Sequence, residues 1–191
     1  MVASKPNARL AAPGRCRYAG AMPRLLLLRH AKAERARPGV SDHERSLSER
    51  GREDAAAVGS AMAARGEQPD TVLCSSAQRT RQTWDEVRPN VEGSPQPRFA
   101  RELYEGGDYL AILRREGGDA RSLLLIGHNP TTHDTATLLA ADLTTSDGAL
   151  LTQRFPTAAL AILDFDGSWA DLRPGAARLA AFIRPRDGQG D

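Results

Sequence analysis

Two histidines and two arginines each stand at, or just beyond, the end of a short apolar run: Arg29, His30, Arg79 and His128. Open parallel sheets bind ligands at the carboxyl ends of their strands, so one pocket could receive all four side chains. Arginine offers planar, bidentate donors that suit phosphate, and guanidinium groups nearby favour the neutral, nucleophilic form of a histidine. This set therefore predicts phosphoryl transfer, with His30 as the nucleophile and the other three residues around the phosphate.

The elements that must position these residues alternate between strand and helix. Short apolar runs predict buried strands at 24–30, 71–74 and 122–126. Helices are predicted at 48–64, 77–87, 109–116 and 131–140. A β-hairpin is predicted over 158–173, with its turn at Asp166-Gly167. This order predicts an α/β fold: a three-layer α/β/α sandwich with a mostly parallel central sheet.

The run Arg29-His30-Ala31-Lys32-Ala33-Glu34 resembles the opening motif of the histidine phosphatase superfamily, also called the phosphoglycerate mutase-like fold. Its Arg-His-Ala-Lys-Ala form is most similar to the small SixA-type phosphohistidine phosphatases. Three later segments agree with the family in order and spacing. They are Asp42-His43-Glu44-Arg45-Ser46-Leu47-Ser48 with Gly51, Cys74-Ser75-Ser76-Ala77-Gln78-Arg79-Thr80-Arg81-Gln82-Thr83, and Gly127-His128-Asn129-Pro130. The resemblance covers roughly residues 23–174, nearly the whole predicted domain.

The resemblance implies a role for each residue of the site. His30 is the nucleophile that becomes phosphorylated, while Arg29, Arg79 and His128 complete the catalytic pocket and bind the phosphate of the substrate. Glu102, in the run 101–104, best matches the acid of the family. No metal and no other cofactor is implied.

The substrate implied by the SixA-like motif is a phosphorylated protein carrying phosphohistidine. The short chain leaves few residues to build a lid, which suits a bulky substrate. A phosphomonoesterase that acts on a small phosphorylated metabolite is the alternative. A non-catalytic phosphate-binding module on the same fold is a second alternative, and turnover of an aryl phosphate without added metal separates it from an enzyme.

Other reactive side chains have structural interpretations. His43 lies in a charged loop and is expected to be solvated, whereas His133 falls within a predicted helix and is expected to pack or to lie on the surface. Cys74 and Arg79 have four residues between them, not the five of Cys-x5-Arg phosphatases, so Cys74 is interpreted as a buried small hydrophobe. The spacing of His128 and His133 does not fit the His-Glu-x-x-His metal motif.

Length and composition set the remaining expectations. The 191 residues suit one domain, predicted over 23–175, with a disordered tail over 1–22, an alternative start at Met22 and a C-terminal tail over 176–191. The net charge of +2 includes four basic and no acidic residues in 1–22, so the remainder is mildly acidic and no nucleic-acid partner is expected. No apolar run approaches the ~20 residues of a membrane span. The two cysteines do not form a disulfide framework, which predicts a cytoplasmic protein in a reducing environment. The sequence does not predict the oligomeric state.

Overall fold

The fold is built on one six-stranded sheet, described by a computed structural model over residues 22–185. Almost all of the predicted N-terminal tail lies outside these residues. The strand order is β3-β2-β4-β1-β5-β6, in which β1 to β4 run parallel and β5 runs antiparallel to both of its neighbours. The strands are β1 (Arg24–Arg29), β2 (Thr71–Ser75), β3 (Arg98–Ala100), β4 (Ser122–Gly127), β5 (Leu160–Phe165) and β6 (Ala177–Ile183).

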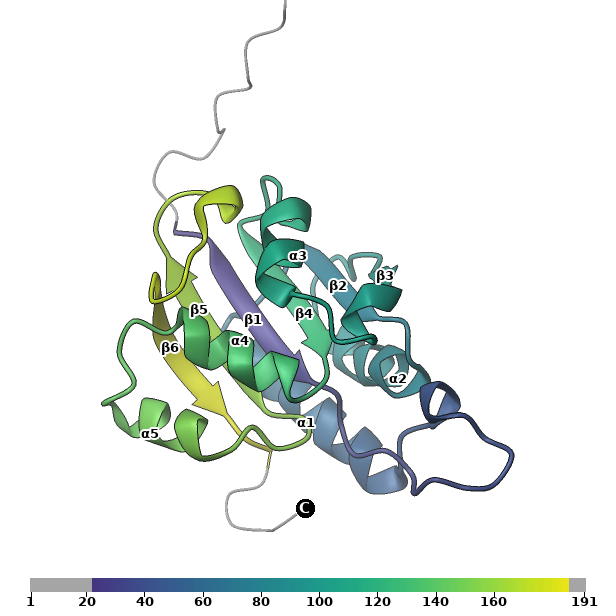
Figure 1. Cartoon of the computed structure of the whole chain (residues 1–191). Helices are drawn as coiled ribbons and strands as arrows, with labels where there is room; N and C mark the ends of the chain where they lie inside the picture. The colour runs from purple at the N-terminus through teal and green to yellow at the C-terminus, as the bar shows by residue number, and fades with distance from the viewer. Residues whose placement is uncertain (1–21, 186–191) are drawn as a thin grey trace, which may run out of the picture.

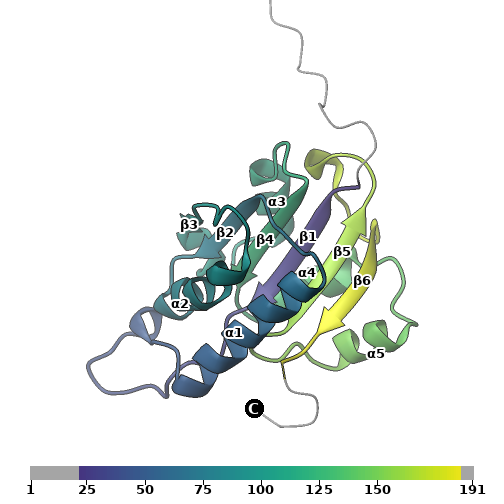
Figure 2. The same cartoon turned by 180° about the vertical axis from the view of Figure 1, so that it is seen from behind.

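Helices cover both faces of this sheet and make it the middle of three layers (Figure 1 and Figure 2). The helices are α1 (Glu49–Ala64), α2 (Gln78–Val87), α3 (Tyr109–Glu116), α4 (Thr131–Leu139) and α5 (Ser146–Gln153). Alternate side chains of each strand point to opposite faces. Leu25 and Leu27 of β1 therefore pack with residues of α3, α4 and α5, whereas Leu26 and Leu28 pack with residues of α1 and α2. The three-layer α/β/α architecture predicted from the sequence is confirmed.

The loop from β1 to α1 is fixed to the start of α1 by a close backbone approach. Ser48 caps the helix through its Oγ, which accepts a hydrogen bond from the amide of Gly51 at 3.1 Å. The amide of Ser48 donates to the carbonyl of Lys32 at 2.9 Å. A Cβ at position 51 would lie 2.0 Å from that same carbonyl oxygen, so only glycine fits there. This contact ties the residues that follow β1 to the body of the domain.

The C-terminal boundary predicted at residue 175 is wrong. The second strand of the hairpin is β6, at Ala177–Ile183, and it pairs with β5 along the edge of the sheet. Residues 168–173 instead form a turn around a 3-10 helix (Trp169–Asp171), because the indole of Trp169 is buried against Phe165 with ring centroids 5.0 Å apart. The alanine-rich composition of β6 carries only a weak strand pattern. The short strand β3 and helix α5 were likewise not predicted.

None of the helices formed within residues 22–185 combines the length and apolar character needed to cross a membrane.

Candidate active site

His30 and His128 leave the sheet side by side because of the register of two parallel strands. Arg29, the last residue of β1, pairs with Gly127, the last residue of β4. The two histidines follow at the next position of each strand, and their ring centroids lie 5.0 Å apart. The amide of His30 donates to the carbonyl of Gly127 at 3.0 Å, which extends the pairing by one residue. Figure 1 shows β1 and β4 ending at the same edge of the sheet.

The imidazole of His30 is oriented by its own backbone neighbour. Its Nδ1 lies 2.7 Å from the carbonyl oxygen of Ala31. A carbonyl can only accept, so Nδ1 carries the proton and, in the neutral ring, Nε2 carries the free lone pair. Burial lowers the pKa of His30 well below its usual range, and His128, Arg79 and Arg29 lower it further. The ring is therefore neutral near pH 7 and presents Nε2 as a nucleophile.

His128 lies between a hydroxyl and a guanidinium. Its Nδ1 is 3.3 Å from Nη2 of Arg79, which can only donate, so Nδ1 is the acceptor and Nε2 carries the proton. That Nε2 lies 2.7 Å from Oγ of Ser75 at the end of β2. Burial, followed by the charge of Arg79, lowers the pKa of His128 to about 3. The backbone amide of His128 donates to the hydroxyl of the buried Tyr109 at 3.1 Å.

Arg79, in the first turn of α2, is the most enclosed cation of the site. It is 7% exposed. Its Nη1 donates to the backbone carbonyl of Asp42 at 2.7 Å, and its Nη2 donates to the carboxylate of Asp42 at 3.0 Å. Arg29 reaches the site from the end of β1, and its Nη1 donates to the carbonyl of Phe155 at 2.8 Å. Both guanidinium groups are thus held by backbone carbonyls, which reduces the entropy lost when they bind an anion.

A polar rim surrounds this centre and comes from the β1–α1 loop and the segment before α3. The hydroxyl of Tyr104 donates to the Asp42 carboxylate at 3.2 Å, and its ring lies edge-on to His128 with centroids 5.6 Å apart. The sequence predicted that His43 is solvated, but in the structure its side chain has two partners. Its Nε2 lies 2.9 Å from Oγ of Ser76, and its ring meets Tyr104 with centroids 4.8 Å apart.

Asp42 is an anionic residue of this rim, and two ion pairs keep its carboxylate ionised. Arg45 Nη1 donates to Oδ1 of Asp42 at 2.7 Å, while Arg79 contacts Oδ2. Hydrogen bonds from Arg45, Arg79 and Tyr104 hold the pKa of Asp42 at about 2. The carboxylate is therefore charged at neutral and at mildly acidic pH.

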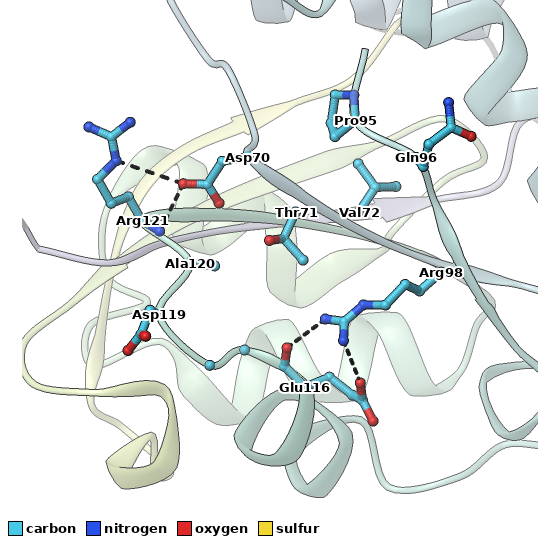
Figure 3. Close-up of a pocket in the computed structure, with 12 residues that line it drawn as sticks. Asp70, Thr71, Val72, Pro95, Gln96, Arg98, Glu116, Asp119, Ala120 and Arg121 are labelled. Carbon is cyan, nitrogen blue, oxygen red and sulfur yellow. Dashed lines mark hydrogen bonds and ion pairs between the residues drawn. The ribbon is translucent and has the colours of Figure 1, made fainter. Parts of the chain in front are cut away.

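A cavity of about 310 Å³ opens on the nucleophile. Seven residues line it: Arg29, His30, Lys32, Ala33, Arg45, Arg79 and Thr157. A larger hollow of about 710 Å³ lies at the other end of the sheet, at the amino ends of β2 and β4 (Figure 3). Four of its charged side chains pair with each other, Arg98 with Glu116 at 2.9 Å and Arg121 with Asp70 at 3.8 Å. The smaller cavity, and not the larger one, holds groups suited to phosphoryl chemistry.

Comparisons with known proteins agree with this geometry. Residues 25–109 match the model of the histidine phosphatase superfamily (branch 1). A candidate phosphohistidine phosphatase SixA from Nakamurella multipartitia is 34% identical, with a TM-score of 0.74, over 87% of this chain and 98% of that chain. A second one, from Agrobacterium tumefaciens, is 32% identical, with a TM-score of 0.70, over 86% of this chain and 99% of that chain.

The chain belongs to the histidine phosphatase superfamily. Its likeness to the two SixA structures assigns it to the SixA-type branch and to the phosphoglycerate mutase-like fold. The predicted enzyme class, a phosphatase, is confirmed with the family. An uncharacterized protein of Mycobacterium tuberculosis (strain H37Rv) is also 38% identical over 165 residues, which are 83% of this chain and the whole of that protein.

Four of the five predicted site residues of this histidine phosphatase lie together, and Glu102 does not join them. Arg29, His30, Arg79 and His128 surround one end of the sheet, as described above. The Glu102 carboxylate forms an ion pair with Arg115 on α3. Among the described residues, no hydrogen bond or ion pair links it to the other four. Tyr104, two positions further on, is the residue of that run that faces the pocket.

The groups that hold the pocket residues in place were not predicted from the sequence. They are Asp42, Ser75, Tyr104, Tyr109 and the carbonyl of Phe155. Asp42 and Ser75 lie within motifs that carried the family resemblance, so their positions could have been suspected. Tyr109 begins α3 and Phe155 lies between α5 and β5, and neither residue falls within those motifs. Cys74, by contrast, is buried as predicted, and burial raises the pKa of its thiol to about 12.

Proposed function

We propose that this enzyme hydrolyses phosphohistidine on a protein through a covalent phosphoryl intermediate on His30. The observation that carries the proposal is the free Nε2 lone pair of His30, set by the 2.7 Å hydrogen bond from Nδ1 to the Ala31 carbonyl. Arg29 and Arg79 line the same cavity, and His128 lies beside His30. Such groups stabilise the negative charge on the peripheral oxygens of a phosphoryl group in transfer.

The reaction has two steps. Nε2 of His30 attacks phosphorus, a P–N bond forms to His30, and the bond to the leaving group breaks with its electron pair going to the leaving nitrogen. Water then attacks phospho-His30, the new P–N bond breaks, and His30 recovers its lone pair as inorganic phosphate leaves. Each step is easier than direct attack by water on the substrate, because the nucleophile is positioned beforehand.

Two features favour phosphohistidine over a phosphate ester. When the other ring nitrogen of the phosphohistidine carries a proton, the group that leaves is a neutral imidazole. Neutral imidazole is a much better leaving group than an alkoxide, so its departure depends less on a protein acid. The contacts of Glu102 with Arg115 fit that lower demand, although the role of Glu102 stays a prediction. The similar structures from Nakamurella and Agrobacterium, named as SixA, support the same substrate class.

The experiment compares kcat/KM for a phosphorylated histidine-containing phosphotransfer protein with kcat/KM for a panel of phosphorylated metabolites, in the presence of EDTA. We expect the phosphoprotein to be preferred, and activity to survive chelation because guanidinium groups supply the positive field. A metabolite that exceeds the phosphoprotein would identify the enzyme as a phosphomonoesterase. No turnover of any substrate, aryl phosphates included, would indicate a binding module.

Arg79→Lys serves as the variant that links turnover to this pocket. Lysine cannot present two coplanar donors to two phosphate oxygens. We expect at least about a tenfold loss of kcat/KM, equal to roughly 1.4 kcal/mol of transition-state stabilisation. Full activity in Arg79→Lys would remove Arg79 from the site.

A further inference from the structure

The cavity on His30 holds more positive charge than one phosphoryl group needs. Four cationic side chains line it: Arg29, Lys32, Arg45 and Arg79. Among the described residues that line it there is no carboxylate, and Asp42, which pairs with both Arg45 and Arg79, offsets one charge. Arg29 and Arg79 are the cations proposed to hold the phosphoryl group, which brings a charge of about −2 at pH 7. Lys32 and Arg45 add positive charge to the same cavity beyond these two.

Lys32 and Arg45 are the cations that the phosphoryl chemistry leaves unused. Within residues 22–185, no side chain forms a salt bridge or hydrogen bond with the ammonium group of Lys32. Arg45 is held in place by its Nε and Nη2, which donate to the carbonyl of Glu34 at 3.1 and 2.7 Å. A cation fixed by a backbone carbonyl and a partly buried, unpaired lysine on the same cavity form a site ready for a second anion.

We propose that Lys32 and Arg45 form a second anion subsite, which binds a carboxylate side chain next to the phosphohistidine of the protein substrate. Lys32 follows the nucleophile by two residues, so their Cα atoms lie at most about 7 Å apart. One or two residues of an extended peptide span the same distance. The subsite therefore contacts the side chain one or two positions away from the phosphohistidine. This inference rests on the proposed function.

The test uses phosphohistidine peptides that differ only in the residues flanking the phosphohistidine, which are Glu, Gln or Lys. We expect wild-type kcat/KM to fall in that order, with Glu about fivefold above Gln, as for a partly exposed ion pair. Lys32→Gln should reduce the Glu-to-Gln ratio to less than about twofold. Arg35→Gln is the matched control: it removes one positive charge from the same loop, at an exposed position that does not line the cavity, and should keep the ratio.

Equal rates for the Glu and Gln peptides, or a preference for Glu that survives in Lys32→Gln, would overturn the subsite. A second arm separates its failure from failure of the proposed function. If no phosphohistidine peptide is hydrolysed, O-phosphoserine is compared with phosphoethanolamine, which lacks its carboxylate. A preference for O-phosphoserine that Lys32→Gln removes would retain the second anion subsite and reject the protein substrate. No preference would reject both.

Discussion

The Asp42 carboxylate accepts a hydrogen bond from Nη2 of Arg79 at 3.0 Å, so the chain supplies an anion to the guanidinium that is proposed to hold phosphate. The same carboxylate binds Arg45 and the hydroxyl of Tyr104. Its pKa of about 2 means that it stays charged until strongly acidic pH. Asp42 therefore orients Arg79 and, at the same time, repels an incoming phosphate.

Asp42→Asn tests this double role through phosphate binding. The amide keeps a hydrogen-bond acceptor for Arg79 but removes one negative charge near the phosphate. A unit charge about 4 Å away is worth about 1 kcal/mol in water, so we expect inorganic phosphate to inhibit roughly fivefold more tightly. The inhibition constant measures it directly. Unchanged or weaker inhibition would show that orientation by Asp42 outweighs its repulsion.

Burial of His30 and His128 predicts that both rings stay neutral in mildly acidic solution. Both pKa values lie below the usual 6.5, that of His128 at about 3. Nitrogen NMR shifts of the two imidazoles should thus remain those of neutral rings from pH 7.5 to 5.5. Folding stability should decline as pH falls below 6.5, because the unfolded chain takes up protons that the folded rings refuse. A titration midpoint near 6.5 for either ring would contradict this account.

Gly51→Ala tests the contact between α1 and the residues after β1. The added Cβ would lie 2.0 Å from the carbonyl oxygen of Lys32, so helix or loop must move. We expect a loss of about 3 kcal/mol of unfolding free energy, together with lower kcat, because Lys32 follows His30 closely. Ser60→Thr also adds one methyl group to α1, but at an exposed position, and should change stability by less than about 0.5 kcal/mol. Equal changes of unfolding free energy in the two variants would show that the close approach at Gly51 does not stabilise the fold.

Tyr109→Phe tests the support beneath His128. The Tyr109 hydroxyl accepts from the amide of His128 at 3.1 Å and donates to the carbonyl of Leu103 at 2.8 Å, in a buried setting. Removing it leaves a buried donor and a buried acceptor without this partner. Chemical denaturation should show a loss of about 1–3 kcal/mol. A neutral effect would mean that His128 is held by other contacts.

Helices and strands with a clear apolar pattern and polar residues at their ends could be predicted from the sequence. The apolar runs of β1, β2 and β4 predicted that Arg29, His30 and His128 lie at the same end of the sheet. The capping residue Ser48 predicted the start of α1. The weaker elements were missed. β3 has only three residues, and β6 is an edge strand rich in alanine. Their positions depend on pairing partners that local sequence does not reveal.

The site shows the same division. The catalytic residues could be predicted from their type and their position at strand ends, whereas the residues that hold them in place could not. His43 illustrates the difficulty: its loop is charged, yet Ser76 and Tyr104, far apart in the sequence, give it partners. The family resemblance implies Glu102 from its position in the chain, but the 3-10 helix at Arg101–Leu103 places Tyr104, and not Glu102, next to His128.

Trapping the phosphoenzyme tests the central claim most directly. Wild-type enzyme is quenched at high pH during turnover, and the site of phosphorylation is found by mass spectrometry. We expect one acid-labile, alkali-stable phosphoryl group on His30, as a phosphoramidate requires. His30→Ala should abolish both label and turnover, whereas Cys74→Ser should retain both, because the raised pKa of the Cys74 thiol keeps it protonated. A phosphoryl group found on Cys74 or on a serine would contradict the account.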